Sequence, residues 1–409
     1  MRTAASSLPA TVRLGSVLSA IEAGKSLKAE PRPAGPDEMG VLKLSAVTWG
    51  TFDPSENKTL PPDADVAGVP TVEQGDLLIS RANTTELVGA VAIPVDSHPN
   101  LILSDKTLRL VVDPALGERR YLYYALRSPV ARQHIESRAT GTSGSMRNIS
   151  QETIREIPVP LPPLSAQRRI AAILDEADAL RRKRREALGL LDELLRSAFL
   201  EMFGDPVTNP RGWPVVRLDT AADIASGVTK RHKLNGRSTV TVPYMRVANV
   251  QDGHIRLDDV NGIEVLPEDV ERYRLLPGDL LLTEGGDPDK LGRGAVWYGE
   301  IDPCIHQNHV FRVRCDTSKL LPEFGSTILG SDLGKRYFAR SAKQTTGIAS
   351  INMTQLRGAP VLMPPLSEQL RWETFVAAHR NQVAARHRQG DQADHLFNSL
   401  LQRAFTGRL

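Results

Sequence analysis

The sequence predicts an α+β protein with two similar globular domains and two long helices. Three observations predict this fold: an internal repeat at an offset of about 203 residues, short apolar runs in both halves, and a helical pattern of about 40 residues at the end of each half. The offset is far longer than the roughly 20–50 residues of stacking repeats. The chain therefore contains a duplicated domain and no solenoid.

The repeat consists of five short matches that occur in the same order in both halves. Their offsets lie between 202 and 204 residues, which chance does not explain for five ordered matches. From the N-terminus, the matches are Val12–Leu14 with Val216–Leu218, Lys43–Val47 with Arg246–Val250, Gly75–Ile79 with Gly278–Leu282, Leu126–Ser128 with Leu329–Ser331, and Pro162–Gln167 with Pro364–Gln369.

Each globular part combines predicted strands with predicted helices. Apolar runs bounded by Gly, Pro, Asn and Asp have the length of strands. These runs are Asp76–Ile79, Val88–Ile93, Leu108–Val112, Asp279–Leu282 and Val310–Arg314. The segments Tyr121–Ser128 and Leu333–Phe338 have a helical pattern, so the sequence favours an α+β domain over an all-β one.

A long helix is predicted after each Pro-Pro-Leu-Ser segment. Ser165 and Ser367 are suited to be N-caps, because a serine hydroxyl accepts from an unpaired backbone N–H of the first turn. Apolar residues then follow at steps of three and four, and Gly204 is expected to end the first helix. Neither helix has an evident buried partner within its own half. We therefore expect the two helices to pack against each other as an antiparallel coiled coil that holds the globular domains apart.

Composition restricts the class of protein. The chain has 409 residues, 41% hydrophobic and 24% charged residues, and two cysteines. These values are typical of a soluble protein of two or three domains in a reducing compartment. No apolar run is long enough for a membrane helix, and no signal peptide is evident, so we expect a cytoplasmic protein. The net charge of +3 permits nucleic-acid binding without requiring it.

The motifs of this duplicated chain resemble those of Type I restriction–modification specificity subunits over essentially the whole sequence. The motifs are Ile157–Gln167 with its repeat Ala359–Gln369, Gly75–Arg81 followed by Leu87–Val91, and Phe199–Pro206. The resemblance implies two target recognition domains, residues 1–163 and 205–365, and two spacer helices, residues 164–204 and 366–409. Met363 in place of Leu161, and Gly390 inside the second helix, are small departures from the pattern.

The resemblance also implies a function and partners. A member of this family recognises an asymmetric bipartite site on double-stranded DNA and catalyses nothing itself. It binds two methyltransferase (modification) subunits and is joined by restriction, or translocase, subunits. No cofactor is expected in this subunit, because S-adenosylmethionine, ATP and Mg²⁺ are used by the partner subunits. No membrane partner is expected.

Motifs for catalysis or metal binding are incomplete. Asn209-Pro210 lacks the second proline and the aromatic residue of an adenine methyltransferase motif, and Gly24-Lys25-Ser26 lacks the first glycine of a phosphate loop. A metal-dependent nuclease pair from Pro36-Asp37 and Glu56–Lys58 is a weak alternative. Cys304, His306, His309 and Cys315 fit no common zinc spacing, and Cys315 is expected to be a small core residue on one face of a strand.

Candidate DNA contacts are polar residues of two equivalent Gly-, Ser- and Thr-rich loops, together with three cations. Short polar side chains and cations suit contacts to base edges and phosphates, although ordinary solvated loops have the same composition. The candidates are Lys43, Arg81, Ser143, Ser145, Arg147, Asn148, Arg246, Gln344, Thr345, Thr346 and Asn352.

Two alternative functions remain open from the sequence. One is a recognition module of a Type II-like restriction or modification enzyme, which needs a methylase or nuclease motif. The other is a structural coiled-coil adaptor without DNA contacts. The run Arg181–Arg185 suits either phosphate contacts or a solvated, partner-facing stretch of helix, and the mid-seam residues Arg184 and Arg386 either extend to solvent or contact a partner protein.

Overall fold

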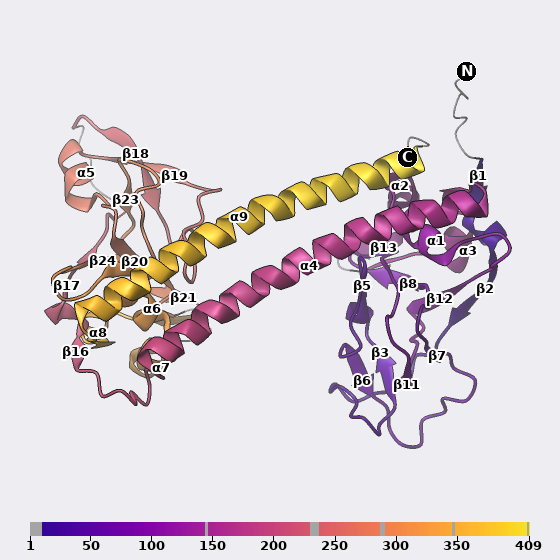
Figure 1. Ribbon diagram of the computed structural model, residues 1–409, viewed down its shortest axis with the longest axis horizontal. Helices are drawn as coiled ribbons and strands as arrows, with labels where there is room; N and C mark the ends of the chain where they lie inside the picture. The colour runs from indigo at the N-terminus through magenta and orange to yellow at the C-terminus, as the bar shows by residue number, and fades with distance from the viewer. Residues whose placement is uncertain (1–9, 144–145, 230–236, 287–290, 346–347, 407–408) are drawn as a thin grey trace. The chain divides into compact units, whose positions relative to one another are not determined.

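The computed structural model describes residues 10–143, 146–229, 237–286, 291–345, 348–406 and 409. Contacts divide the chain into unit 1, residues 1–185 with 388–409, and unit 2, residues 186–387. Each unit contains one globular part and a portion of both long helices, α4 (Leu164–Phe203) and α9 (Leu366–Phe405) (Figure 1). The predicted α+β fold with two long helices is confirmed, whereas the division into four segments remains a prediction.

The described residues of unit 1 form small sheets and three short helices, α1 to α3, besides parts of the two long helices. One sheet has the order β10-β8-β12-β2, a second β6-β3-β11-β7 and a third β13-β14-β9, and β1 pairs with β15 and β4 with β5. The bounds are β1 Thr11–Arg13, β2 Leu18–Ala23, β3 Gly40–Leu42, β4 Val47–Thr48, β5 Thr51–Phe52, β6 Asn57–Thr59, β7 Thr71–Val72, β8 Leu78–Ser80, β9 Ala82–Asn83, β10 Val91–Ala92, β11 His98–Ile102, β12 Thr107–Val112, α1 Arg119–Leu126, α2 Pro129–Arg138, β13 Thr140–Ser143, β14 Met146–Asn148, α3 Gln151–Arg155 and β15 Pro158–Pro160, with short 3-10 turns at Leu14–Val17 and Leu44–Ala46.

Unit 2 repeats this plan. Its sheets have the orders β17-β24-β20-β22, β19-β18-β23 and β21-β26-β25, and β16 pairs with β27. The bounds are β16 Val215–Arg217, β17 Ala222–Ser226, β18 Val240–Met245, β19 Asn261–Val265, α5 Pro267–Tyr273, β20 Asp279–Thr283, β21 Gly285–Gly286, β22 Gly294–Val296, β23 Ile305–His306, β24 Val310–Cys315, α6 Pro322–Gly330, α7 Asp332–Ser341, β25 Lys343–Thr345, β26 Ile348–Ser350, α8 Met353–Arg357 and β27 Pro360–Leu362, with a 3-10 turn at Leu218–Thr220.

The two units agree in strand order and in register. β8 of unit 1 has the place of β20 in unit 2, and the parallel pairing of β3 with β11 recurs as the parallel pairing of β18 with β23. The internal repeat predicted from the sequence is therefore a repeat of structure. Most predicted strands are found within a residue or two of their expected bounds, but Val88–Ile93 shortens to β10 because Thr84–Ala90 forms a hydrogen-bonded turn.

The Gly-Asp pair of each repeat forms a tight turn before a core strand. Gly75 and Gly278 have φ of 80° and 93°, a region that favours glycine. The following carboxylates accept from a backbone N–H three residues earlier, that of Glu73 at 2.9 Å and that of Leu276 at 2.7 Å. This turn explains why the motif occurs twice.

Each globular core includes residues of both long helices. In unit 1, Leu174 of α4 and Phe397 of α9 are buried in the same cluster as Tyr121 and Tyr124 of α1. In unit 2, Phe199 and Phe203 of α4 lie with Trp372 of α9 and Phe324 of α6, and the rings of Phe199 and Trp372 are 5.2 Å apart. The expectation that neither helix has a buried partner within its own half is therefore wrong, because the short helices of each unit cover the long ones.

The two long helices run antiparallel within each unit. In unit 1, Arg181 of α4 pairs with Asp394 of α9 at 2.5 Å, and Arg184, further along α4, donates to the carbonyl oxygen of Gln389 at 2.8 Å. In unit 2, His379 of α9 is hydrogen bonded to the carbonyl oxygen of Leu191 at 2.9 Å. The predicted mid-seam arginine of α4 thus bonds to the partner helix.

The start of α4 differs from the prediction. α4 begins at Leu164, so Ser165 lies inside the first turn and is not the N-cap. The buried amide of Gln167 joins the helix start to the globular part instead. Its Nε2 donates to the carbonyl oxygens of Pro162 at 2.8 Å and Leu116 at 3.2 Å, and its Oε1 accepts from the N–H of Glu118 at 2.8 Å. We call this arrangement the glutamine clamp.

Gln369 forms the same clamp in unit 2. Its Nε2 donates to the carbonyl oxygens of Pro364 at 2.9 Å and Lys319 at 3.0 Å, and its Oε1 accepts from the N–H of Leu321 at 2.9 Å. The glutamine of the repeated Pro-Pro-Leu-Ser-x-Gln motif is therefore structural. Ser367, like Ser165, lies within its helix.

The end of α4 agrees with the sequence analysis, and the glycine within α9 does not interrupt that helix. Gly204 directly follows α4 with φ of 79°, and its N–H donates to the carbonyl oxygen of Leu200 at 2.9 Å, as expected for a C-terminal cap. α9 continues without interruption through Gly390. Gly407, which follows α9 in the sequence, lies outside the described residues. Among the described helices, none has a stretch apolar and long enough to cross a membrane.

Candidate nucleic-acid interface

A three-stranded sheet of unit 1 brings several predicted DNA contacts together. The hairpin β13–β14 carries Arg147 and Asn148, and β14 pairs with β9 so that Arg147 lies opposite Asn83 and Asn148 opposite Ala82. β9 directly follows Arg81. Residues far apart in the sequence thus form one small polar surface.

Arg147 stabilises this hairpin as well as lying on it. Its guanidinium donates to the carbonyl oxygen of Ala139 and to that of Gly141, the latter at 3.2 Å. Gly141 has φ of 130°, and a Cβ there would lie 2.3 Å from the carbonyl oxygen of Met146, so this position requires glycine. Part of the hydrogen-bonding capacity of Arg147 is therefore already used within the hairpin.

Arg81 lies on the exposed face beside the hairpin. Ser80 and Ala82 are buried, whereas Arg81 and Asn83 are half-buried, an alternation expected of an extended segment with one face outward. Among the described residues, the Arg81 side chain forms no ion pair. Its guanidinium is available for an incoming ligand.

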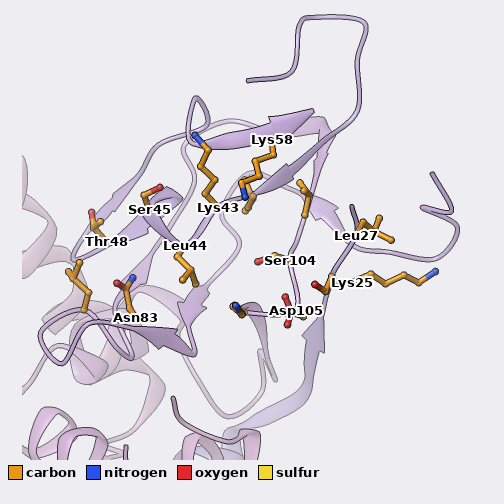
Figure 2. A pocket seen from close by; sticks show the side chains of 15 residues that line it. Lys25, Leu27, Lys43, Leu44, Ser45, Thr48, Lys58, Asn83, Ser104 and Asp105 are labelled. Atoms are coloured by element: carbon orange, nitrogen blue, oxygen red, sulfur yellow. The ribbon is translucent and has the colours of Figure 1, made fainter. Parts of the chain in front are cut away.

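A basic cleft of about 560 Å³ adjoins this surface. Lys43, Lys58 and Lys106 line it together with Asn83 and Asp105. In Figure 2, Lys43 and Lys58 lie on one side of the cleft and Asn83 and Asp105 on the other. Clustered ammonium groups on a polar surface attract phosphates.

Lys25 and Lys43 are partly neutralised by nearby carboxylates. The Nζ of Lys43 is 3.5 Å from an oxygen of Glu56, and the Nζ of Lys25 is 3.0 Å from an oxygen of Asp65. Among the described residues, Lys58 and Lys106 form no ion pair. They are therefore the stronger attractants for an anion in this cleft.

In unit 2 the predicted residues are less clustered. Arg246, at the position equivalent to Lys43, donates to the carboxylate and the carbonyl oxygen of Asp259, both at 2.8 Å. Asn352 is the N-cap of α8 and exchanges hydrogen bonds with Gln355 in a capping box, so its side chain has a structural role. Its assignment as a DNA contact remains a prediction.

The remaining candidates are placed only by their backbone or not at all. Ser143 is the last residue of β13, and Gln344 and Thr345 lie in β25 opposite Ala349 and Ile348. Ser145 and Thr346 lie outside the described residues. The two loops are thus equivalent hairpins, as their matching positions in the repeat predict.

The four Cys and His residues considered as metal ligands, Cys304, His306, His309 and Cys315, lie in different environments. Cys304 and His306 are fully buried, whereas His309 is exposed and forms a 2.5 Å contact with Glu284. Cys315 packs at the edge of the core of unit 2, as predicted. Across the part of the chain that the structure describes, no group of three His, Cys, Asp or Glu side chains is arranged to hold a metal ion.

Acid is expected to destabilise unit 2 through His306. Burial lowers the pKa of His306 to about 4, and its Nδ1 is 2.7 Å from the carbonyl oxygen of Val310. In the unfolded chain this histidine binds a proton near pH 6.5, whereas in the folded unit it binds one only near pH 4. The free energy of unfolding therefore falls as the pH decreases through this window. The full loss is about 3 kcal/mol, measured as the pH dependence of urea unfolding.

A variant pair isolates this effect from other acid-sensitive groups. His306→Asn retains a donor for Val310 and should lose less stability than the wild type between pH 6.5 and 4. His254→Asn, at an exposed histidine, should behave as the wild type does. Equal pH dependence of all three proteins would contradict the assignment.

Sequence reasoning missed Lys58, Asn83 and Lys106. Asn83 had a signal, because it lies two residues after Arg81 in an extended segment and so shares its face. Lys58 belongs to β6 and Lys106 to the turn before β12, and no local pattern joins these segments. Only the pairing of the strands shows that they line one cleft.

Comparison with known proteins finds similar sequences and similar folds. The model of the Type I restriction modification DNA specificity domain matches residues 64–189. The Type I restriction enzyme EcoEI specificity subunit of Escherichia coli is 30% identical over 165 residues, which are 40% of this chain and 28% of that protein. The StySPI specificity subunit of Salmonella potsdam is 24% identical over 262 residues, 61% of this chain and 56% of that protein. The chain thus spans from about a quarter to just over half of the length of these relatives.

Solved structures agree with the fold. The S subunit of a Type I restriction–modification system from M. genitalium has a TM-score of 0.56 at 14% identity, covering 97% of this chain and 96% of that chain. A chain from a structure of complex assembly in a type I R-M system has a TM-score of 0.56 at 21% identity, covering 98% and 100%. Residues 64–189 thus match the specificity-domain model, the chain is similar to curated Type I restriction enzyme specificity subunits, and the solved structures share its fold.

Proposed function

We propose that this chain is the DNA-recognition subunit of a Type I restriction–modification enzyme. Each unit binds one half of an asymmetric, bipartite site on double-stranded DNA. The subunit itself is non-catalytic, and S-adenosylmethionine, ATP and Mg²⁺ are bound by the modification and restriction subunits that join it.

The observation that carries this proposal is one fold present twice with different charged side chains at equivalent places. Lys43 lines a basic cleft in unit 1, whereas its counterpart Arg246 in unit 2 is held by Asp259. Two units of one fold with different surface chemistry suit two half-sites of different sequence. The lysine cleft also favours DNA binding over a purely structural adaptor.

Exposed apolar residues on the long helices support the binding of partner proteins. Leu190 and Leu194 of α4 in unit 2 are 63% and 48% exposed, and they lie one turn apart on the same helix face. Leu370 of α9 in unit 2 is 58% exposed, and Leu396 of α9 in unit 1 is 53% exposed. The adjacent pair Leu190 and Leu194 forms a contiguous apolar patch, which suits a surface that a partner covers.

The proposal is tested by expressing the chain with its cognate modification subunit in a host without restriction–modification systems. Sequencing that detects methylated bases should show one bipartite motif with two different half-sites. The purified chain alone should neither methylate nor cleave DNA when S-adenosylmethionine, ATP and Mg²⁺ are supplied. A continuous palindromic motif, or turnover by the isolated chain, would overturn the proposal.

A further inference from the structure

Arg81 of unit 1 and Glu284 of unit 2 occupy the same backbone position. The N–H of Arg81 donates to the carbonyl oxygen of Lys106 at 2.9 Å, and its carbonyl oxygen accepts from the N–H of Ile149 at 2.9 Å. The N–H of Glu284 donates to the carbonyl oxygen of His309 at 3.0 Å.

The second bond of Glu284 completes the match. Its carbonyl oxygen accepts from the N–H of Ile351 at 2.8 Å, as that of Arg81 accepts from Ile149. In both units this residue therefore connects the turn before a core strand to the end of the polar hairpin. Both side chains are half-buried and lie on segments that continue into the three-stranded sheets, β9 and β21.

The charge at this shared position is reversed between the units. In unit 1 the neighbours Arg81 and Lys106 are both cations. In unit 2 the corresponding residues are Glu284 and His309, and an oxygen of the Glu284 carboxylate is 2.5 Å from Nδ1 of His309. His309 thereby orients the carboxylate, and no other described residue forms an ion pair with it.

A carboxylate at this position is unsuited to contact the DNA backbone, because the negatively charged phosphates repel it. On a base edge, by contrast, a carboxylate accepts from the exocyclic N4 amine of cytosine, and an arginine fork donates to O6 and N7 of guanine. The same backbone position carries arginine in unit 1 and glutamate in unit 2. This pair suits contacts to two different bases better than contacts to phosphates.

We infer that residues 81 and 284 are equivalent base-reading positions, with Arg81 taking a guanine in one half-site and Glu284 taking a cytosine in the other. The inference rests on the proposed function. It deepens that function by naming the position at which the two units differ in base preference.

The test uses Arg81→Gln and Glu284→Gln in the complex with the modification subunit. Glutamine forms paired hydrogen bonds with N6 and N7 of adenine, so each variant should move one base pair of one half-site from G·C toward A·T. Selection from randomised DNA should show this change at a single position. Binding to the original site should fall roughly 10- to 100-fold, while binding to random DNA changes little.

Control variants separate base reading from charge and folding. Arg155→Gln removes the same charge from an exposed position on α3 and should leave both half-sites unchanged. Arg81→Lys should keep the guanine with weaker binding. Should a glutamine variant fail to fold by thermal melting, Arg81→Ala and Glu284→Ala should lose discrimination at the same base pair.

The outcomes distinguish this inference from the function on which it rests. A wild-type complex without a bipartite motif would overturn the proposed function. A normal wild-type motif, with variants that weaken binding to all sequences equally or change no base, would overturn the inference alone.

Discussion

Replacing Gln167 or Gln369 with alanine is expected to lower the free energy of unfolding of its own unit by about 3 kcal/mol. Each amide is almost fully buried and satisfies three backbone groups. Alanine leaves those groups buried without partners, which costs more than the lost hydrogen bonds alone. Hydrogen exchange during urea unfolding should assign the loss to unit 1 for Gln167 and to unit 2 for Gln369.

Two further substitutions make the clamp prediction specific. Gln402→Ala, at an exposed glutamine of α9, should change stability by less than about 0.5 kcal/mol. Gln167→Glu keeps the shape but turns a carboxylate oxygen toward two carbonyl oxygens, so it should destabilise at least as much as alanine does. Clamp variants as stable as Gln402→Ala would show that the amide is dispensable.

The double substitution Leu190→Lys, Leu194→Lys is expected to weaken binding of the modification subunit by on the order of 100-fold or more. Burying two leucines contributes roughly 1.5–3 kcal/mol each, and burying two lysines in their place is unfavourable. Both leucines are already exposed, so the fold of the chain should not change. Analytical ultracentrifugation with the purified modification subunit measures the effect.

Val95→Lys is the matched control for that experiment. Val95 is 72% exposed in unit 1 and lies outside the long helices, so its replacement should leave assembly unchanged. Undiminished assembly of the leucine variant would contradict the assignment of α4 to partner binding. Equal loss in both variants would point to a general effect of added charge.

The sequence predicted the elements that depend on periodicity and repetition. Leu164–Phe203 and Leu366–Phe405 are helices because apolar residues recur at helical spacing, and Gly204 ends the first because glycine adopts positive φ at low cost. The two-fold repetition of short motifs then indicated two units of one fold, and the strand orders of the two units agree.

Contacts between distant segments could not be predicted in the same way. Ser165 has the properties of an N-cap, but Gln167 makes the decisive contacts because Leu116 and Glu118 approach it from the loop before α1. Likewise, the sequence gives no local reason for the short helices to cover α4 and α9. Such contacts follow from tertiary packing, which local propensity does not encode.

For the candidate site, the sequence identified cations but not their surroundings. Lys43 and Arg246 match in the repeat, yet one lines a cleft and the other is bound by Asp259. Arg81 was predicted as a DNA contact, whereas Glu284 was not, because phosphates repel a carboxylate. The repeat offset of 203 residues aligns the two positions, and the backbone hydrogen bonds confirm that they are equivalent in the fold.

The central claim is that each unit recognises its own half-site. It is tested most directly by a chimeric chain that carries the globular part of unit 1 in both units. Replacing Val215–Leu362, from β16 to β27, with Thr11–Pro160, from β1 to β15, exchanges equivalent structures at equivalent ends. Mapping methylated bases in cells that express this chimera with the modification subunit should return two copies of one half-site, that of unit 1, in place of two different ones. A motif that keeps the wild-type asymmetry would contradict the claim.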